Sequence, residues 1–226
     1  MGLQCYIFEF KFTTSKTMKI PPNIDFFIFD LGNVIIDIDY DFSINELKKI
    51  LPEHKHDLTA QFFPSQFHKD YEKGEISSEE FRNEVRRLYN EDWTDSQIDH
   101  VWNSLLRTIP QERIDLVHRL KFQYGTGILS NTNAIHIEKM AEILQDQNGE
   151  SSVYSLCQAV FLSHEMGLAK PDLAIYEAVL DEIKIPGKNV LFFDDLAANV
   201  EGAKKAGMQS YQITHPRGLV EFFGLI

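Results

Sequence analysis

Three short apolar runs that each end in polar residues constrain the fold of this chain more than any other feature. The runs span residues 26–29, 126–129 and 190–193. They end at Asp30, at Ser130 and at the pair Asp194–Asp195. Continuous apolar runs of this length are typical of strands that are buried on both faces. Because ligands bind outside the carboxyl ends of the strands in an open parallel sheet, these polar side chains are expected to form one site.

Helical periodicity alternates with strand patterns in the second half of the chain, which predicts an α/β fold with a doubly wound parallel sheet. Helices are expected at residues 110–124, 135–144, 172–183 and 198–206, and further strands at 159–162 and 209–213. No second strand pattern follows Asp30 until residue 126. The first strand is therefore expected to be separated from the rest of the sheet by an insertion.

The insertion reads as a helical module with apolar faces of its own. Capping-box patterns begin at Ser43, Ser77 and Thr94, and each is followed by apolar residues at helical spacing. These patterns predict three parts of the chain. They are an N-terminal extension at 1–20, an α/β core at 21–39 and 109–226, and a helical cap at 40–108.

The composition excludes several classes of partner. A net charge of -12 argues against a nucleic-acid-binding surface, although a bound divalent cation would still allow a small anionic substrate. No uncharged apolar run approaches the ~18 residues that would cross a membrane. Cys5 and Cys157 have neither metal-site spacing nor the density of a disulfide scaffold, which favours a cytoplasmic setting. No pattern indicates an oligomeric state.

Four fragments carry a resemblance to a known family. They are FDLGN at 29–33, LSNTN at 129–133, Lys170–Pro171, and FDD at 193–195. In this order they resemble motifs I to IV of the haloacid dehalogenase-like (HAD) hydrolase superfamily, and the inserted helices resemble its C1-type cap. The stretch FDLGNVIIDIDY at 29–40, with GEIS at 74–77, is similar to a bacterial branch that includes α-glucose-1-phosphate phosphatases.

The resemblance implies a role for each residue of these fragments. Asp30 would be a nucleophile that forms an aspartyl-phosphate. The carboxylates of Asp30 and Asp195 and the carbonyl of Gly32 would hold Mg²⁺. Asp194 would contribute from the outer shell and Asn199 would orient a metal-bound water or Lys170, although either residue could equally cap the helix that follows. The remaining phosphate-binding residues would be Ser130, Asn131 and Lys170.

Each of these residues also has a plain structural interpretation. Asp30, Ser130 and one of the two adjacent aspartates could simply cap the helices that follow them. Lys170 could be a solvated surface lysine. It is the joint occurrence of the fragments, in order and at strand ends, that favours the functional interpretation.

Gly32 is a departure from the family pattern. Most phosphatases of the superfamily have an aspartate at this position, which protonates the leaving alcohol and then activates water. Loss of a general acid/base typically costs ~10²–10⁴-fold in rate. Three explanations stay open. Asp37 or Asp39 could substitute, the substrate could have a good leaving group, or the protein could be a poor catalyst.

The sequence therefore predicts a Mg²⁺-dependent phosphatase that acts on a small phosphorylated metabolite, a sugar phosphate, through an aspartyl-phosphate. The alternative is a non-catalytic or weakly active protein of the same fold that binds a phosphorylated ligand or a protein partner. Gly32 is the feature that keeps this alternative open.

Overall fold

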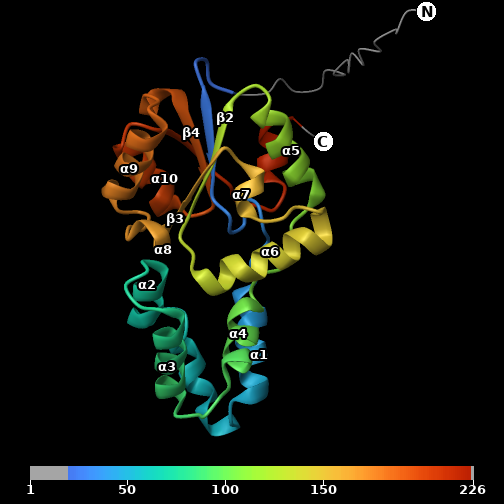
Figure 1. Cartoon of the computed structure of the whole chain (residues 1–226), viewed down its shortest axis with the longest axis vertical. Helices are drawn as coiled ribbons and strands as arrows, with labels where there is room; N and C mark the ends of the chain where they lie inside the picture. The colour runs from blue at the N-terminus through green and yellow to red at the C-terminus, as the bar shows by residue number, and fades with distance from the viewer. Residues whose placement is uncertain (1–19, 225–226) are drawn as a thin grey trace, which may run out of the picture.

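The core of the protein is one five-stranded parallel sheet with the strand order β3-β2-β1-β4-β5 (Figure 1). The computed structural model describes residues 20–224, so the predicted extension at 1–20 lies almost wholly outside the described residues. The strands are β1 (Phe26–Phe29), β2 (Gly125–Ser130), β3 (Ala159–Leu162), β4 (Val190–Asp194) and β5 (Gln209–Gln212). All five predicted strands are confirmed.

Helices cover both faces of this sheet, because alternate residues of each strand point to opposite faces. Phe27 and Phe29 pack into one apolar cluster with α5 (Gln111–Lys121), α6 (Ala134–Asn148), α7 (Val153–Leu156) and α11 (Gly218–Phe222). Phe26 and Ile28 pack into another with α9 (Leu173–Ile183) and α10 (Ala197–Lys205). The predicted doubly wound α/β fold is confirmed.

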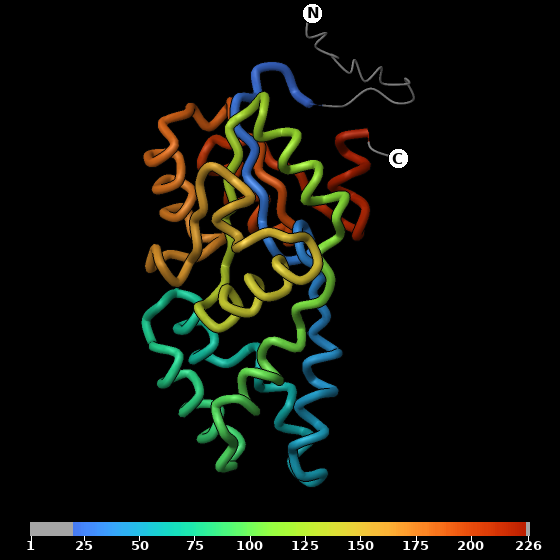
Figure 2. The backbone as a smooth tube through the Cα atoms, turned by 45° about the vertical axis from the view of Figure 1, so that its right-hand side comes forward, coloured from blue at the N-terminus to red at the C-terminus, as the bar shows by residue number. Residues whose placement is uncertain are grey.

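The segment between β1 and β2 forms a separate group of helices, here called the helical unit (residues 40–103). It consists of α1 (Tyr40–Ile50), the 3₁₀ helix η1 (Glu53–Gln61), α2 (Gln66–Glu72), α3 (Ser78–Tyr89) and α4 (Asp95–Asn103). An aromatic-rich cluster fills its interior, with Trp102 packed against Phe62 and Phe81. Helix α6 lies between this unit and the sheet (Figures 1 and 2). The domain limits at residues 40 and 108 stay a prediction.

The helix starts within this unit agree with two of the three capping-box predictions. Ser77 and Thr94 are the N-caps of α3 and α4, and both capping boxes are complete. The start predicted at Ser43 is wrong, because α1 begins at Tyr40 with Asp39 as its N-cap. Ser43 lies inside α1, and its hydroxyl donates a hydrogen bond to the carbonyl of Val101, 2.7 Å away. This bond ties α1 to α4.

Several elements were not predicted, and one predicted helix is shorter than expected. The sequence did not indicate η1, α2, α7, α8 (Ser163–Met166), η2 (Gly187–Asn189) or α11. Most of them are too short to show a clear helical period. The helix expected at 110–124 ends at Lys121. No helix within residues 20–224 has the length and apolarity that crossing a membrane requires.

Two chain segments that run side by side join the helical unit to the core. Asp37 N donates to Thr108 O and Arg107 N donates to Asp37 O, both at 2.9 Å, and Asp39 N donates to Leu105 O at the same distance. Ile38 and Leu106 form an antiparallel bridge between these bonds. Because both connections are paired, the unit is attached to the core by a double-stranded joint.

A second contact fastens the far side of the helical unit, where the turn after α2 meets α8. The Ser163 hydroxyl donates to the carbonyl of Glu72. Gly74 has a φ of 69°, and a Cβ at this position would lie 2.1 Å from the carbonyl oxygen of His164. Glycine is therefore required at position 74 both by its backbone conformation and by the close approach of α8.

This close approach predicts that Gly74→Ala destabilises the protein more than Gly149→Ala does. Gly149 has a φ of 74° and nothing within 4 Å of a Cβ, so its substitution carries only the backbone strain, about 1 kcal/mol. Gly74→Ala adds the clash with His164, on the order of 1–3 kcal/mol. Urea denaturation of both variants and the wild type measures the difference. Equal losses would mean that the turn after α2 does not contact α8 in solution.

Candidate active site

Lys170 brings together the ends of two strands at the carboxyl edge of the sheet. Its Nζ atom lies 2.9 Å from Oδ1 of Asp30, directly after β1, and 2.6 Å from Oδ2 of Asp194, at the end of β4. It also donates a hydrogen bond to the carbonyl of Leu129 in β2, 3.0 Å away. The Lys170 side chain is only 1% exposed, so it is not a solvated surface lysine. Asp30 and Asp194 outweigh the effect of burial on Lys170 and raise its pKa.

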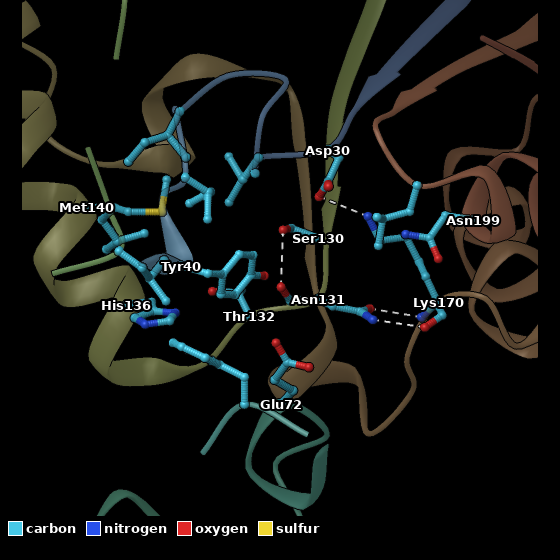
Figure 3. Close-up of a pocket in the computed structure, with 18 of the residues that line it drawn as sticks. Asp30, Tyr40, Glu72, Ser130, Asn131, Thr132, His136, Met140, Lys170 and Asn199 are labelled. Atoms are coloured by element: carbon cyan, nitrogen blue, oxygen red, sulfur yellow. Dashed lines mark hydrogen bonds and ion pairs between the residues drawn. The ribbon is translucent and has the colours of Figure 1, made fainter. Parts of the chain in front are cut away.

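The loop after β2 holds Lys170 in this position. The side-chain amide of Asn131 donates to the carbonyl of Lys170 and accepts from its backbone N–H, each at 2.9 Å (Figure 3). The Asn131 side chain is therefore engaged, and its backbone N–H is the group that could bind a phosphate. The Ser130 hydroxyl makes a long 3.5 Å contact with the Asn131 carbonyl, which does not prevent it from donating to a ligand.

The two adjacent aspartates have different surroundings. Asp194 is fully buried, and its oxygens accept hydrogen bonds from the Asn199 side chain (3.0 and 3.1 Å) and from Leu196 N (2.8 Å), in addition to the ion pair with Lys170. Asp195 is half-buried, and Oδ2 accepts one hydrogen bond from the Asn33 side chain at 2.9 Å. Asn199 thus orients Asp194, whereas Asp195 keeps free acceptor capacity.

The carboxylates at this edge of the sheet form a group that suits a divalent cation. One oxygen each from Asp30, Asp194 and Asp195 lie within 4.8 Å of one another. Asp30 Oδ1 is buried and contacts Lys170, but it accepts no aligned hydrogen bond from residues 20–224. Lys170 forms ion pairs with Asp30 and Asp194 but not with Asp195. Burial raises the pKa of Asp30 to about 7, with Lys170 opposing the rise and Asp194 adding to it. A hard cation bound by oxygen ligands would relieve this excess of negative charge.

The site opens into a pocket of about 210 Å³ between the sheet edge and the helical unit. Asp30, Gly32, Ser130 and Lys170 line its core side, and Tyr40, His68 and Glu72 line its far side. The remaining walls are largely apolar and include Ile36, Ile38, Phe63, Leu105, Leu106, Met140 and Leu196. Figure 3 shows the Glu72 carboxylate facing this space from below, with Asp30 at its upper end.

The two aspartates proposed as substitutes at Gly32 lie outside this pocket. Asp37 forms an ion pair of 2.8 Å with the buried Arg113, which also donates to the carbonyl of Pro216 at 2.6 Å. Asp39 accepts a hydrogen bond from Phe42 N at 2.9 Å as the cap of α1. Both carboxylates are held by other partners, so this geometry does not support either as the missing acid.

Comparison with known proteins assigns the family. The model of the haloacid dehalogenase-like hydrolase family matches residues 24–207. The chain belongs to this family. The predicted resemblance is thereby confirmed.

Relatives within the family include phosphatases. A D-ribitol-5-phosphate phosphatase from Bacteroides thetaiotaomicron is 23% identical over 82% of this chain and 89% of that protein. A HAD family enzyme from the same organism, solved in complex with magnesium and inorganic phosphate, is 32% identical over 84% of this chain and 93% of that one, with a TM-score of 0.76. A HAD-like hydrolase from Porphyromonas gingivalis is 29% identical over 84% and 91%, with a TM-score of 0.77.

Two histidines line the pocket of this HAD-like hydrolase, and sequence reasoning missed both. His136 is a neutral structural residue. Its Nδ1 atom accepts a hydrogen bond from the Asn133 side chain (3.1 Å), and Nε2 donates to the carbonyl of Trp102 (3.2 Å). Burial lowers the pKa of His136 to about 4. No pattern in the sequence would have indicated this role.

The contacts of His68 favour its charged form. Its Nδ1 atom lies 2.5 Å from the carbonyl of Phe63, which can only accept, so Nδ1 carries a proton. Its Nε2 atom lies 3.2 Å from Oε1 of Glu72, and this contact is favourable only if a proton lies between the two atoms. Burial lowers the pKa of His68, but the hydrogen bond to Glu72 and its charge outweigh burial and raise it. The i, i+4 spacing of the two residues on a helix was the sequence signal.

This pair predicts a pH-dependent contribution of His68 to stability. Burial raises the pKa of Glu72, but His68 outweighs burial and lowers it. The stabilisation from His68 is complete below its unfolded pKa of 6.5 and is lost as pH rises through the higher folded value. His68→Gln keeps an N–H donor but removes the charge. It should therefore lose more unfolding free energy at about pH 5.5 than at about pH 9.

Urea denaturation at the two pH values measures this difference against the wild type. The matched control is His54→Gln, the same substitution at an exposed position of η1. A loss for His68→Gln that is the same at both pH values would contradict a charged His68.

Proposed function

We propose that this protein is a Mg²⁺-dependent phosphatase that hydrolyses a small phosphorylated metabolite, a sugar or sugar-alcohol phosphate, through an aspartyl-phosphate. One observation carries the proposal. Asp30 is buried at the floor of a pocket, where its Oδ1 atom forms an ion pair with Lys170 and one of its oxygens lies within 4.8 Å of oxygens from two further carboxylates, Asp194 and Asp195. The names of the relatives, which include a D-ribitol-5-phosphate phosphatase and a magnesium–phosphate complex, support it.

In this mechanism Asp30 attacks the phosphorus atom, the bond to the leaving oxygen breaks, and an aspartyl-phosphate forms. The Ser130 hydroxyl, the Asn131 backbone N–H and the Lys170 ammonium hold the phosphoryl oxygens. Water then hydrolyses the acyl phosphate and releases inorganic phosphate. Asp30, Asp195 and the carbonyl of Gly32 would hold Mg²⁺, which, when bound, offsets the charge of the transferring group.

The helical unit contributes by closing the pocket over the substrate. Its double-stranded joint at residues 37–39 and 105–108 and its contact with α8 hold it against the core. Exclusion of bulk water from the pocket strengthens the electrostatic interactions of Lys170 with the phosphoryl group. The predicted cytoplasmic setting and the absence of nucleic-acid and membrane partners stay predictions.

Gly32 supports the second candidate function, a weakly active or non-catalytic ligand-binding protein. A Cβ at Gly32 would come no closer than 3.4 Å, to Ile38 Cγ1, and the Gly32 backbone does not have a positive φ. The position could therefore hold a side chain, and the missing carboxylate is a chemical difference, not a steric requirement. A leaving group that departs without a protein-bound proton would reconcile Gly32 with catalysis.

Asp30→Asn should abolish turnover and leave the fold intact, because it removes the nucleophile and keeps its shape. We expect phosphate release from a panel of sugar phosphates with Mg²⁺ to fall by at least about a thousandfold. The control is Asp181→Asn, at an exposed site on α9. Chelation of the metal should also stop turnover in the wild type. A rate near that of the wild type in Asp30→Asn would exclude this mechanism.

We expect Asp195→Asn to affect chiefly Mg²⁺ binding and Asp194→Asn to affect chiefly stability, through the ion pair with Lys170. Asp195 keeps free acceptor capacity, so its variant should weaken Mg²⁺ binding more, as measured by calorimetric titration. Asp194 is the buried partner of Lys170, so its variant should lose more unfolding free energy, about 3–5 kcal/mol. A reversed order in the titration would show that the ligand is misassigned.

A further inference from the structure

The far side of the pocket ends in the His68–Glu72 pair, which the mechanism above does not use. Oε1 of Glu72 faces the charged His68 ring, 3.2 Å away. The other carboxylate oxygen, Oε2, has no ion-pair partner among residues 20–224. Glu72 therefore offers a negatively charged acceptor at the end of the pocket opposite Asp30 (Figure 3).

The backbone that carries the Glu72 side chain is held in place by contacts at Glu72 itself and at Gly74. The Ser163 hydroxyl donates to the Glu72 carbonyl, and Ser163 Oγ also accepts from Thr132 N at 2.9 Å. Gly74, two residues on, packs against the carbonyl of His164. Glu72 is thus tied to the loop that carries Ser130 and Asn131. A residue that binds the leaving group must lie at a fixed distance from the residues that bind the phosphate, and this connection provides it.

The pocket offers no free cation to a second anionic group. Among the residues that line it, Lys170 is paired with Asp30 and Asp194, and His68 is paired with Glu72. His136 is neutral, since its ring nitrogens bond to the Asn133 side chain and the Trp102 carbonyl. An anion at this end would face the Glu72 carboxylate without compensation, whereas a hydroxyl group could donate to it.

We propose that the His68–Glu72 pair selects the leaving group: Glu72 accepts hydrogen bonds from the hydroxyls of a neutral polyhydroxy leaving group and rejects substrates that carry a second anionic group. The inference rests on the proposed phosphatase function and names the substrate class of that site. His68 is a positioning residue, because it acts by holding Glu72.

One feature near the pocket opposes this selection. Lys69 and Lys73 lie in a neighbouring groove that Glu72 also lines. A substrate that extended past Glu72 into this groove could place an anion beside these lysines. Preference for an anionic leaving group is therefore the outcome that would overturn the proposal.

The experiment compares two open-chain esters that differ only at the end remote from the phosphate. D-Glucitol 6-phosphate ends in a hydroxymethyl group, and 6-phospho-D-gluconate ends in a carboxylate. p-Nitrophenyl phosphate, which has neither hydroxyls nor a second anion, reports on metal-dependent hydrolysis itself. Phosphate release with Mg²⁺ gives kcat and KM for each ester, and the ratio of kcat/KM for the glucitol ester to that for the gluconate ester measures the selection.

In the wild type this ratio should exceed about ten, because the gluconate carboxylate would face the Glu72 carboxylate without a compensating cation. Glu72→Gln should lower the ratio by about tenfold or more, chiefly through KM, since it removes the charge and weakens a charge-assisted hydrogen bond. In this variant the amide can donate to the free lone pair of His68 Nε2, so the pair and the fold are retained.

His68→Gln should move the ratio the other way or leave it unchanged, because it removes the positive charge and keeps Glu72. A merely structural role of the pair would instead lower activity on both esters alike in both variants. Glu79→Gln is the matched control, since Glu79 is an exposed acid on α3 that does not line the pocket. Its ratio should equal that of the wild type.

The outcomes separate the two proposals. A ratio near one in the wild type, or one that Glu72→Gln leaves unchanged, overturns the selection by Glu72 while metal-dependent hydrolysis of p-nitrophenyl phosphate upholds the phosphatase function. Preference for the gluconate ester overturns it as well and points to the lysines of the neighbouring groove. Hydrolysis of p-nitrophenyl phosphate without release from either sugar ester also overturns the selection by Glu72 and leaves the phosphatase function standing. Absence of phosphate release from all three esters overturns both.

Discussion

The buried ammonium of Lys170, shared between Asp30 and Asp194, is the interaction on which the arrangement of this site depends. Three carboxylates at one sheet edge would repel one another and would be costly to bury. Lys170 offsets part of this charge and fixes the spacing between the ends of β1 and β4. The Asn131 side chain and the carbonyl of Leu129 hold the lysine itself, so β2 is part of the same arrangement.

The charge that Lys170 does not offset is what gives the site its chemistry. Asp30 Oδ1 contacts Lys170 but accepts no aligned hydrogen bond from the described residues, and burial raises the pKa of Asp30 to about 7. A carboxylate in these surroundings is stabilised when it binds a cation, and it can react with an electrophile such as a phosphoryl group. The loss of favourable solvation at Asp30 is the physical basis of its proposed reactivity.

The helical unit turns this sheet edge into a pocket, and it is held there by two attachments of different kinds. The joint at residues 37–39 and 105–108 is made of backbone hydrogen bonds, whereas the contact at α8 is made by the Ser163 hydroxyl and a close approach at Gly74. The second attachment also sets where Glu72 stands. The element that covers the pocket thus carries the residue proposed to select the leaving group.

The strands and the position of the site were readable from the sequence, because both depend on local patterns. Apolar runs of four residues predicted β1, β2 and β4. The polar residues directly after these strands lie at the carboxyl edge of a parallel sheet, however the helices pack against it. The resemblance carried by the fragments at Asp30, Ser130, Lys170 and Asp194 indicated the same location. Most of the fold class and the core of the candidate site were therefore predictable.

Tertiary contacts alone decided the rest. By sequence Asp37 is a candidate for the missing acid, but in the structure it forms an ion pair with the buried Arg113, which lies far along the chain. Ser43 and Asp39 are both good N-cap residues, and the hydrogen bond from Ser43 to Val101 lies beyond what a local pattern encodes. The charge on His68 depends on the carbonyl of Phe63 as well as on Glu72. A periodic pattern specifies which face of an element is buried, but the partner of a buried polar group is set only when distant segments meet.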